Sequence, residues 1–284
     1  MVCEKYVASG NDFLIFQTFS RTSRRSLRSL RSLRSWHSLR SLRSWRHLSQ
    51  RSVLVKKLCD RHYGIGADGL IVLNEIPNGS DGFVWEFYNS DGSVATMCGN
   101  GSRAAALYAF NHGLCGRKLT FQTGAGRICA QVLENGHVGV QFPFVRILQS
   151  DLHECAMPAF LLDTGVLHLV LWAQNYAEFA RPTTEELREL RVRYNANVDV
   201  MYVAQNTVRV RTFERGVEAE TLACGTGMAA CFVVAHRNGQ IVGNEGNVIP
   251  ESDEELRFYF SGGSLWFSGK VQYVATCKTD IVSL

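Results

Sequence analysis

Two stretches of the chain repeat one pattern, and they constrain the fold more than any other feature. Residues 97–110 read MCGNGSRAAALYAF and residues 223–236 read ACGTGMAACFVVAH. Each contains Cys-Gly-x-Gly and continues as an alanine-rich apolar run of helical length. Glycine permits close backbone approaches and alanine has the highest helix propensity, so each stretch predicts a helix that begins at its cysteine, Cys98 or Cys224.

The start of a helix is a suitable place for acid/base chemistry. Its first turn has unpaired backbone N–H groups and the positive end of the helix dipole. These stabilise a thiolate, and they can also bind the carboxylate of a substrate. One such cysteine in each half of the chain suggests two acid/base groups that face each other across one substrate.

The two predicted helices are apolar on nearly every side, which is typical of a helix that is buried all round. Most of the remaining chain has strand-like alternation, for example FVWEFYN, LTFQT and TVRVRTFE. We therefore predict the α+β class, with two similar domains, each a mostly antiparallel sheet wrapped around one central helix. Residues 256–269 predict a hairpin, followed by a separate strand over 271–277. Thr183 or Thr184 is expected to cap a polar helix.

Composition indicates a soluble globular protein. The 284 residues are 46% apolar and 20% charged, no apolar run reaches membrane-spanning length, and the first residues lack a hydrophobic signal core. We therefore expect a cytoplasmic protein with no membrane association. Nine cysteines without a C-x-x-C pair or metal-like spacing to histidine argue against a disulfide framework and against a metal site.

A low-complexity Ser/Leu/Arg insert is predicted at about residues 20–52. Its centre is seven triplets of the SLR type, and a period of three matches neither a helical face nor a strand. Residues 21–51 hold ten arginines, so the formal charge of +4 becomes −6 for the rest of the chain. We interpret the insert as a surface loop. The alternative is an arginine-rich arm that binds nucleic acid, which we consider unlikely because composition alone is weak evidence for binding.

Four sequence blocks resemble the signature of the diaminopimelate epimerases. They are GNDF at 10–13, GIGADG at 64–69, NSDGSVATMCGNGSR at 89–103 and ERGVEAETLACGTGMAA at 214–230. The resemblance implies an isomerase that needs no cofactor and interconverts LL- and meso-2,6-diaminopimelate in lysine and peptidoglycan precursor biosynthesis. It also implies a homodimer, and domains comprising residues 1–141 with 271–284 and residues 142–270.

The resemblance assigns roles to particular residues. It implies Cys98, Cys224, His168 and Glu214 as catalytic. The implied substrate-binding residues are Asn11, Asn89, Gly99, Asn100, Asn197, Glu214, Arg215, Gly225 and Thr226. Arg215 suits the distal carboxylate of the substrate, because a guanidinium can bind a carboxylate through two hydrogen bonds.

Several alternatives remain open at this point. His168 could be an ordinary satisfied histidine at a strand end, and Glu214 with Arg215 could be a surface ion pair. The family often has asparagine where this chain has Val166, and sometimes a glutamine near Gly69. Other racemases with two thiols, such as the proline racemases, share the chemistry. A non-catalytic member with a nucleic-acid-binding arm is a further alternative.

Overall fold

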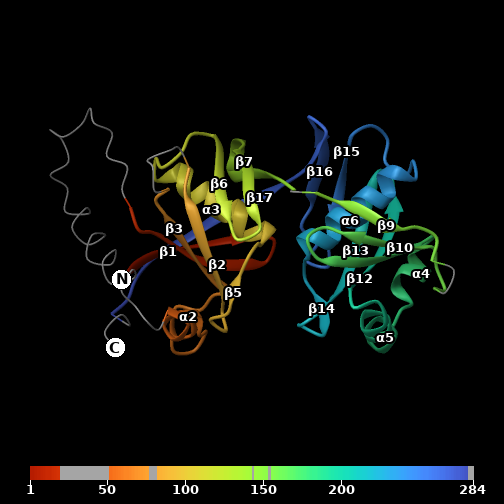
Figure 1. Ribbon diagram of the computed structural model, residues 1–284, viewed down its shortest axis with the longest axis horizontal. Coiled ribbons are helices and arrows are strands. Elements are labelled where there is room, and N and C mark those ends of the chain that lie inside the picture. The colour runs from red at the N-terminus through yellow and green to blue at the C-terminus, as the bar shows by residue number, and fades with distance from the viewer. Residues whose placement is uncertain (20–50, 77–81, 143, 153–154, 281–284) are drawn as a thin grey trace. The chain divides into compact units, whose positions relative to one another are not determined.

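The computed structural model describes residues 1–19, 51–76, 82–142, 144–152 and 155–280. The chain divides into two compact units, residues 1–138 with 270–284 and residues 139–269. In each unit, strands surround one long helix, α3 in the first and α6 in the second (Figure 1).

In its described residues, the first unit contains a mixed sheet and two α-helices. Its strands are β1 (Val2–Ala8), β2 (Asn11–Gln17), β3 (Gly69–Asn74), β4 (Val84–Asn89), β5 (Val94–Ala95), β6 (Lys118–Thr123), β7 (Gly126–Val132), the start of β8 (His137–Gln141) and the end of β17 (Ser264–Lys278). Its helices are α2 (Arg51–Cys59), α3 (Gly99–Asn111) and the short 3-10 helix η1 (Glu134–Gly136). β1 pairs with both β2 and β17, β2 runs parallel to β3, and β3 is antiparallel to β4.

The second unit repeats this plan. Its strands are β9 (Arg146–Gln149), β10 (Ala159–Asp163), β11 (Leu167–Ala173), β12 (Asn197–Ala204), β13 (Thr207–Glu214), β14 (Ala219–Thr221), β15 (Glu245–Ile249), β16 (Leu256–Ser261) and the start of β17. Its helices are α4 (Tyr176–Ala180), α5 (Thr184–Tyr194) and α6 (Gly225–Arg237). β10 and β11 form a hairpin, β11 runs parallel to β12, and β12 is antiparallel to β13.

The two units therefore share one order of pairings. Each has a hairpin, a parallel strand reached through a helix, an antiparallel partner, a short strand, the cysteine-bearing helix and a further strand parallel to the partner. Antiparallel pairs predominate, and the predicted α+β class with two similar halves is confirmed.

The central helices are buried, as their apolar sequences predict. α3 packs against β1, β2, β3 and β7, and α6 packs against β10 to β13 and β15. Every residue of α3 from Asn100 to Ala109 is buried, including Arg103, a fully buried cation in an otherwise apolar helix. In α6, the residues from Gly227 to Phe232 are buried.

The structure refines several local predictions. The predicted insert lies outside the described residues up to position 50, and helix α2 already begins at Arg51, whose guanidinium pairs with Glu86 at 2.9 Å. Thr183 caps α5 in a capping box with Glu186. The separate strand predicted after Gly269 is wrong, because β17 is one continuous strand from Ser264 to Lys278. The strand continues through Gly269, and the chain does not turn there.

Candidate active site

Cys98 occupies the N-cap position of α3, as predicted. Its backbone is extended, with φ −150° and ψ 121°, and its side chain accepts a hydrogen bond from the backbone N–H of Gly101 at 3.3 Å. The thiol is half-buried. The N–H groups of Gly99 and Asn100 belong to the same first turn, where no carbonyl of the helix can accept from them. A sulfur in this position is next to the positive end of the helix dipole.

Two predicted binding residues of the first unit, Asn11 and Asn100, are joined in one chain of hydrogen bonds. Arg103 Nη2 donates to Asn100 Oδ1 at 2.8 Å, Asn100 Nδ2 donates to Asn11 Oδ1 at 2.7 Å, and Asn11 Nδ2 donates to Asp68 Oδ2 at 3.1 Å. A guanidinium only donates and an ionised carboxylate only accepts, so the two ends of the chain orient both amides. Asn11 thus keeps its second amide N–H for another acceptor.

A cluster of charges lies behind Asn11. Arg61 donates to both oxygens of Asp12, at 3.0 and 2.8 Å, and to Asp68 at 2.7 Å, while Lys5 pairs with Asp12 at 2.8 Å. Burial acts to raise the pKa of Asp12, but the hydrogen bonds from Arg61 and Lys5 outweigh it and lower the pKa to about 2. The cluster thus holds an ionised carboxylate on β2, the strand that also carries Asn11.

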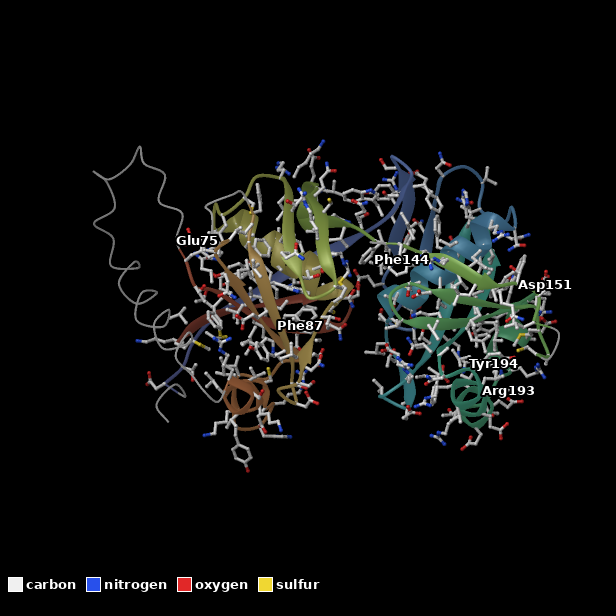
Figure 2. All side chains as sticks on the ribbon, viewed as in Figure 1. Glu75, Phe87, Phe144, Asp151, Arg193 and Tyr194 are labelled. Carbon is white, nitrogen blue, oxygen red and sulfur yellow. The ribbon has the colours of Figure 1, made fainter. Side chains whose placement is uncertain are left out.

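Asn89 is not part of this chain of hydrogen bonds in the structure. It is exposed at the end of β4, and its amide donates to Ser93 Oγ at 3.0 Å. Its partner in the sheet register is Gly69, the position near which the family sometimes has glutamine. A Cβ at position 69 would lie 2.6 Å from the ring of Phe87, which is labelled in Figure 2. The ring therefore leaves no room for a side chain there.

Cys224 occupies the N-cap position of α6, in a different environment from Cys98. It is only 9% exposed, and its sulfur lies 3.4 Å from Thr226 Oγ1. Burial raises the pKa of the Cys224 thiol well above its ordinary value, and the nearby charges of Glu214 and Asp199 act in the same direction. Burial therefore works against the thiolate that the start of α6 favours.

The sheet register brings His168 to Cys224. His168 on β11 is the partner of Asn197 on the parallel strand β12, and the amide nitrogen of Asn197 lies 3.2 Å from His168 Nε2. The same Nε2 lies 3.0 Å from Thr226 Oγ1, and Nδ1 lies 2.6 Å from Asp199 Oδ2. Two predicted residues, Asn197 and Thr226, are thus assembled around one fully buried imidazole.

Glu214 is the last residue of β13 and Arg215 follows it, and the two have separate partners. Glu214 accepts from Thr221 Oγ1 at 2.6 Å, and burial raises the pKa of its carboxyl group. The backbone N–H of Arg215 donates to Asn197 Oδ1 at 2.8 Å, while its exposed guanidinium donates to the carbonyl of Asn195 at 2.9 Å. Each side chain has its own partner, so Glu214 and Arg215 do not form a surface ion pair with each other. The guanidinium is held from one side only and is open to solvent.

Sequence reasoning missed Asp199, Asp68 and Arg103. Two of them did leave a signal in the sequence, because a single charged residue inside a buried apolar segment needs a buried partner. Asp199 is the acid in the strand VDVM, and Arg103 is the cation in an alanine-rich helix. Asp68 lies in a glycine-rich loop, where an acid is common and gives no such signal.

The described residues contain no group of three or more histidine, cysteine, aspartate or glutamate side chains arranged to hold a metal ion. Within the same residues, no helix is both long and apolar enough to cross a membrane.

Comparison with known proteins agrees with this geometry. The family model for diaminopimelate epimerase matches residues 45–143 and 160–272. The chain is 44% identical over 271 residues to the diaminopimelate epimerase of a Nitratiruptor species, covering 95% of each chain. It is 42% identical over 270 residues to that of Campylobacter jejuni, again covering 95% of each chain.

A solved structure of a PhzF-family phenazine biosynthesis protein from Bacillus anthracis superposes with a TM-score of 0.65 at 14% identity and covers 98% of each chain, which shows the shared fold. The extent of the family match and the identity to the curated relatives establish the relationship that the four sequence blocks predicted. The chain belongs to the diaminopimelate epimerase family.

Proposed function

We propose that this chain is a diaminopimelate epimerase that interconverts LL- and meso-2,6-diaminopimelate without a cofactor. In this proposal Cys98 and Cys224 act on opposite faces of the reacting α-carbon, one as base and the other as acid. The observation that carries the proposal is that a chain of this family has one cysteine at the N-cap of each of its two buried central helices.

The two cysteines have different resting roles in this proposal. Cys98 accepts a hydrogen bond from a backbone N–H, a contact that suits a thiolate, whereas burial keeps Cys224 as a thiol. In one direction Cys98 therefore takes the proton from the α-carbon and Cys224 delivers its own proton to the opposite face, and in the reverse direction the two cysteines exchange these roles. One turnover leaves Cys98 as the thiol and Cys224 as the thiolate, and exchange with solvent restores the resting state.

Removal of an α-proton builds negative charge on the carbon and its carboxylate. The first turns of α3 and α6 have N–H groups at Gly99, Asn100, Gly225 and Thr226 that can donate to that carboxylate. Because those donors are fixed by the helices, little reorganisation is needed as charge develops. We therefore assign carboxylate binding to these residues.

The distal end of the substrate carries a second ammonium and a second carboxylate. The guanidinium of Arg215 is exposed and suits the carboxylate, and the exposed amide of Asn89 can reorient toward the same end. The oriented amide of Asn11 offers one further N–H. These partners favour diaminopimelate over proline, which has no second amino-acid group. Glu214 and His168 are assigned to the acid/base environment of Cys224.

The proposal is tested by incubating reduced protein with LL-diaminopimelate in deuterium oxide. Proton NMR follows the loss of the α-proton signal, and chromatography follows the meso isomer. We expect deuterium to enter only in the presence of the protein, while meso product accumulates. Cys98→Ala and Cys224→Ala should each abolish turnover, because a single remaining thiol cannot serve both faces.

Cys129→Ala is the matched control, since Cys129 is a half-buried thiol on β7 and belongs to neither of the cysteine-bearing helices. It should retain wild-type turnover. Turnover in either Cys98→Ala or Cys224→Ala would contradict the two-thiol mechanism. If proline were racemised and diaminopimelate were not, the substrate assignment would be wrong while the mechanism would stand.

Two further properties are proposed from the family: that the protein works in the cytoplasm and that it is a homodimer. Light scattering on the purified full chain tests the second directly. A mass equal to twice the 31.7 kDa of one chain is expected, and a monomeric mass at micromolar concentration would contradict it.

A further inference from the structure

Asp199 is a fully buried carboxylate that the proposed mechanism does not yet use. It lies on β12 between Val198 and Val200, both of which are also fully buried. Its Oδ1 accepts from Thr212 Oγ1 at 2.7 Å, and its Oδ2 lies 2.6 Å from His168 Nδ1. A buried charge is costly unless it is paired and hydrogen-bonded, so both contacts are needed to keep Asp199 where it is.

The first turn of α6 is shaped around this carboxylate. A Cβ at position 227 would lie 2.2 Å from Asp199 Oδ1 and 3.1 Å from Thr212 Oγ1. The second glycine of the Cys-Gly-x-Gly pattern therefore leaves the space that Asp199 occupies. The equivalent glycine of α3, Gly101, faces the side chain of Ile71 at 3.2 Å instead. The same glycine thus makes room for an apolar side chain in one unit and for a carboxylate in the other.

The hydrogen bonds around His168 determine which of its nitrogens carries the proton. The backbone N–H of Arg215 can only donate, so it fixes Asn197 Oδ1 as its acceptor. The amide nitrogen of Asn197 then faces His168 Nε2 and donates to it. Nε2 must be unprotonated to accept, so the proton is on Nδ1 and is donated to Asp199.

The same polarity continues toward the thiol. Because Nε2 is an acceptor, the hydroxyl of Thr226, 3.0 Å away, donates to it. The Thr226 oxygen can then accept from Cys224 Sγ, 3.4 Å away, while the carboxylate of Glu214 is a second hydrogen-bond partner of the thiol. Four side chains, Asp199, His168, Thr226 and Cys224, form one directed series of hydrogen bonds.

We propose that Asp199 is a positioning residue that fixes His168 as the neutral Nδ1–H imidazole, so that His168 and Thr226 together hold the proton of Cys224 in place. The titratable groups that face His168 are Asp199 from β12, Glu214 from the end of β13 and Cys224 from α6. A doubly protonated His168 would carry a hydrogen on Nε2 that points at the donating N–H of Asn197. Two donors repel each other, so this contact disfavours the imidazolium. This inference rests on the proposed function only in the role that it gives to Cys224.

The tautomer of His168 is measured directly by nitrogen-15 NMR of histidine-labelled full-length protein. The His168→Gln variant identifies the His168 signals among those of the eight histidines by their absence. We expect wild-type His168 to be protonated on Nδ1 and unprotonated on Nε2 at neutral pH. In Asp199→Asn, the amide can donate to Nδ1, and the signals should shift toward the Nε2–H tautomer. A wild-type imidazolium or Nε2–H form would overturn the proposal.

Kinetics supply the second readout. Asp199→Asn should lower kcat by about 100-fold, with a smaller change in KM and a shifted pH profile, because the altered group acts in the proton-transfer steps. Combining it with His168→Gln should cost little more than His168→Gln alone, since both act through one imidazole. Asp163→Asn, which alters a carboxylate that caps the turn at Gly165, should leave kcat unchanged.

Two further outcomes separate the possible failures. If Asp199→Asn does not fold, Thr212→Val replaces it, because this change removes the other hydrogen-bond partner of the Asp199 carboxylate. The tautomer of His168 in the wild-type protein still tests the proposal in that case. Wild-type kcat with an unchanged pH profile in folded Asp199→Asn would refute the inference. If the wild type shows the Nδ1–H tautomer but does not epimerise diaminopimelate, the proposed function fails and the positioning role of Asp199 stands.

Discussion

Replacing Gly227 by alanine should damage the second unit far more than the equivalent change damages the first. The added methyl group would lie 2.2 Å from Asp199 Oδ1, whereas an ordinary contact is 3.4 Å or more. The carboxylate must therefore move by more than 1 Å, by the difference between those two distances. Its hydrogen bonds to His168 at 2.6 Å and to Thr212 at 2.7 Å cannot both survive such a movement.

The expected loss of stability follows from these contacts. A hydrogen bond to a charged group contributes about 1.5 to 3 kcal/mol, and overpacking costs about 1 to 3 kcal/mol. Alanine gains at most about 1 kcal/mol over glycine in helix propensity. We expect a net destabilisation of roughly 3 kcal/mol for Gly227→Ala. Gly101→Ala meets Ile71 at 3.2 Å, which a small shift of that side chain relieves, so its net effect should be under about 1 kcal/mol.

Urea unfolding followed by circular dichroism measures the two variants under identical conditions, and hydrogen exchange of the α6 amides locates the effect. Gly227→Ala should also lose most turnover, because His168 loses its partner. If Gly227→Ala were as stable as Gly101→Ala, the space required by Asp199 would not be the reason for the glycine. A structure of Gly227→Ala in which the His168–Asp199 distance is unchanged would also refute this explanation.

Two other predictions follow from the titrating groups. Iodoacetamide at neutral pH should modify Cys98 before Cys224, because the pKa of Cys224 is raised by burial; peptide mass spectrometry gives the order, and prior modification of Cys224 would contradict it. Because the pKa of Asp12 is lowered to about 2, its contribution to stability is present at neutral pH and is lost as the pH falls below about 4. Asp12→Asn should flatten the acid side of the stability profile measured by urea unfolding, whereas the exposed variant Asp253→Asn should follow the wild type.

Local sequence was sufficient to predict the two helix starts. The position of Cys98 and Cys224 depends on the glycines and the alanine-rich runs that follow them, and both signals lie within a few residues of the cysteine. The cap of α5 at Thr183 was predictable for the same reason. Local sequence did not predict the difference between the thiols, because that difference comes from burial and from charges on other strands.

The hydrogen-bonded networks depend on the register between distant strands. His168 and Asp199 are 31 residues apart and meet because β11 and β12 are parallel, a pairing for which neither strand has a local signal. Asn11 on β2 reaches Asn100 across 89 residues because helix α3 packs on that strand. The resemblance to the family supplied Asn11, Asn100 and His168, but it gave no information about the buried charges that orient them.

The path of β17 has a consequence for how the protein is made. Residues 271–278 pair with β1 at the other end of the chain, and the terminal amine of Met1 donates to the carbonyl of Thr279 at 2.6 Å. The second unit is a single continuous segment, so its strands leave the ribosome in one uninterrupted series, whereas one edge of β1 stays open until the end of β17 has been translated. The unit that is synthesised first is therefore completed last, and its exposed strand edge is the part of the nascent chain that a chaperone would need to protect.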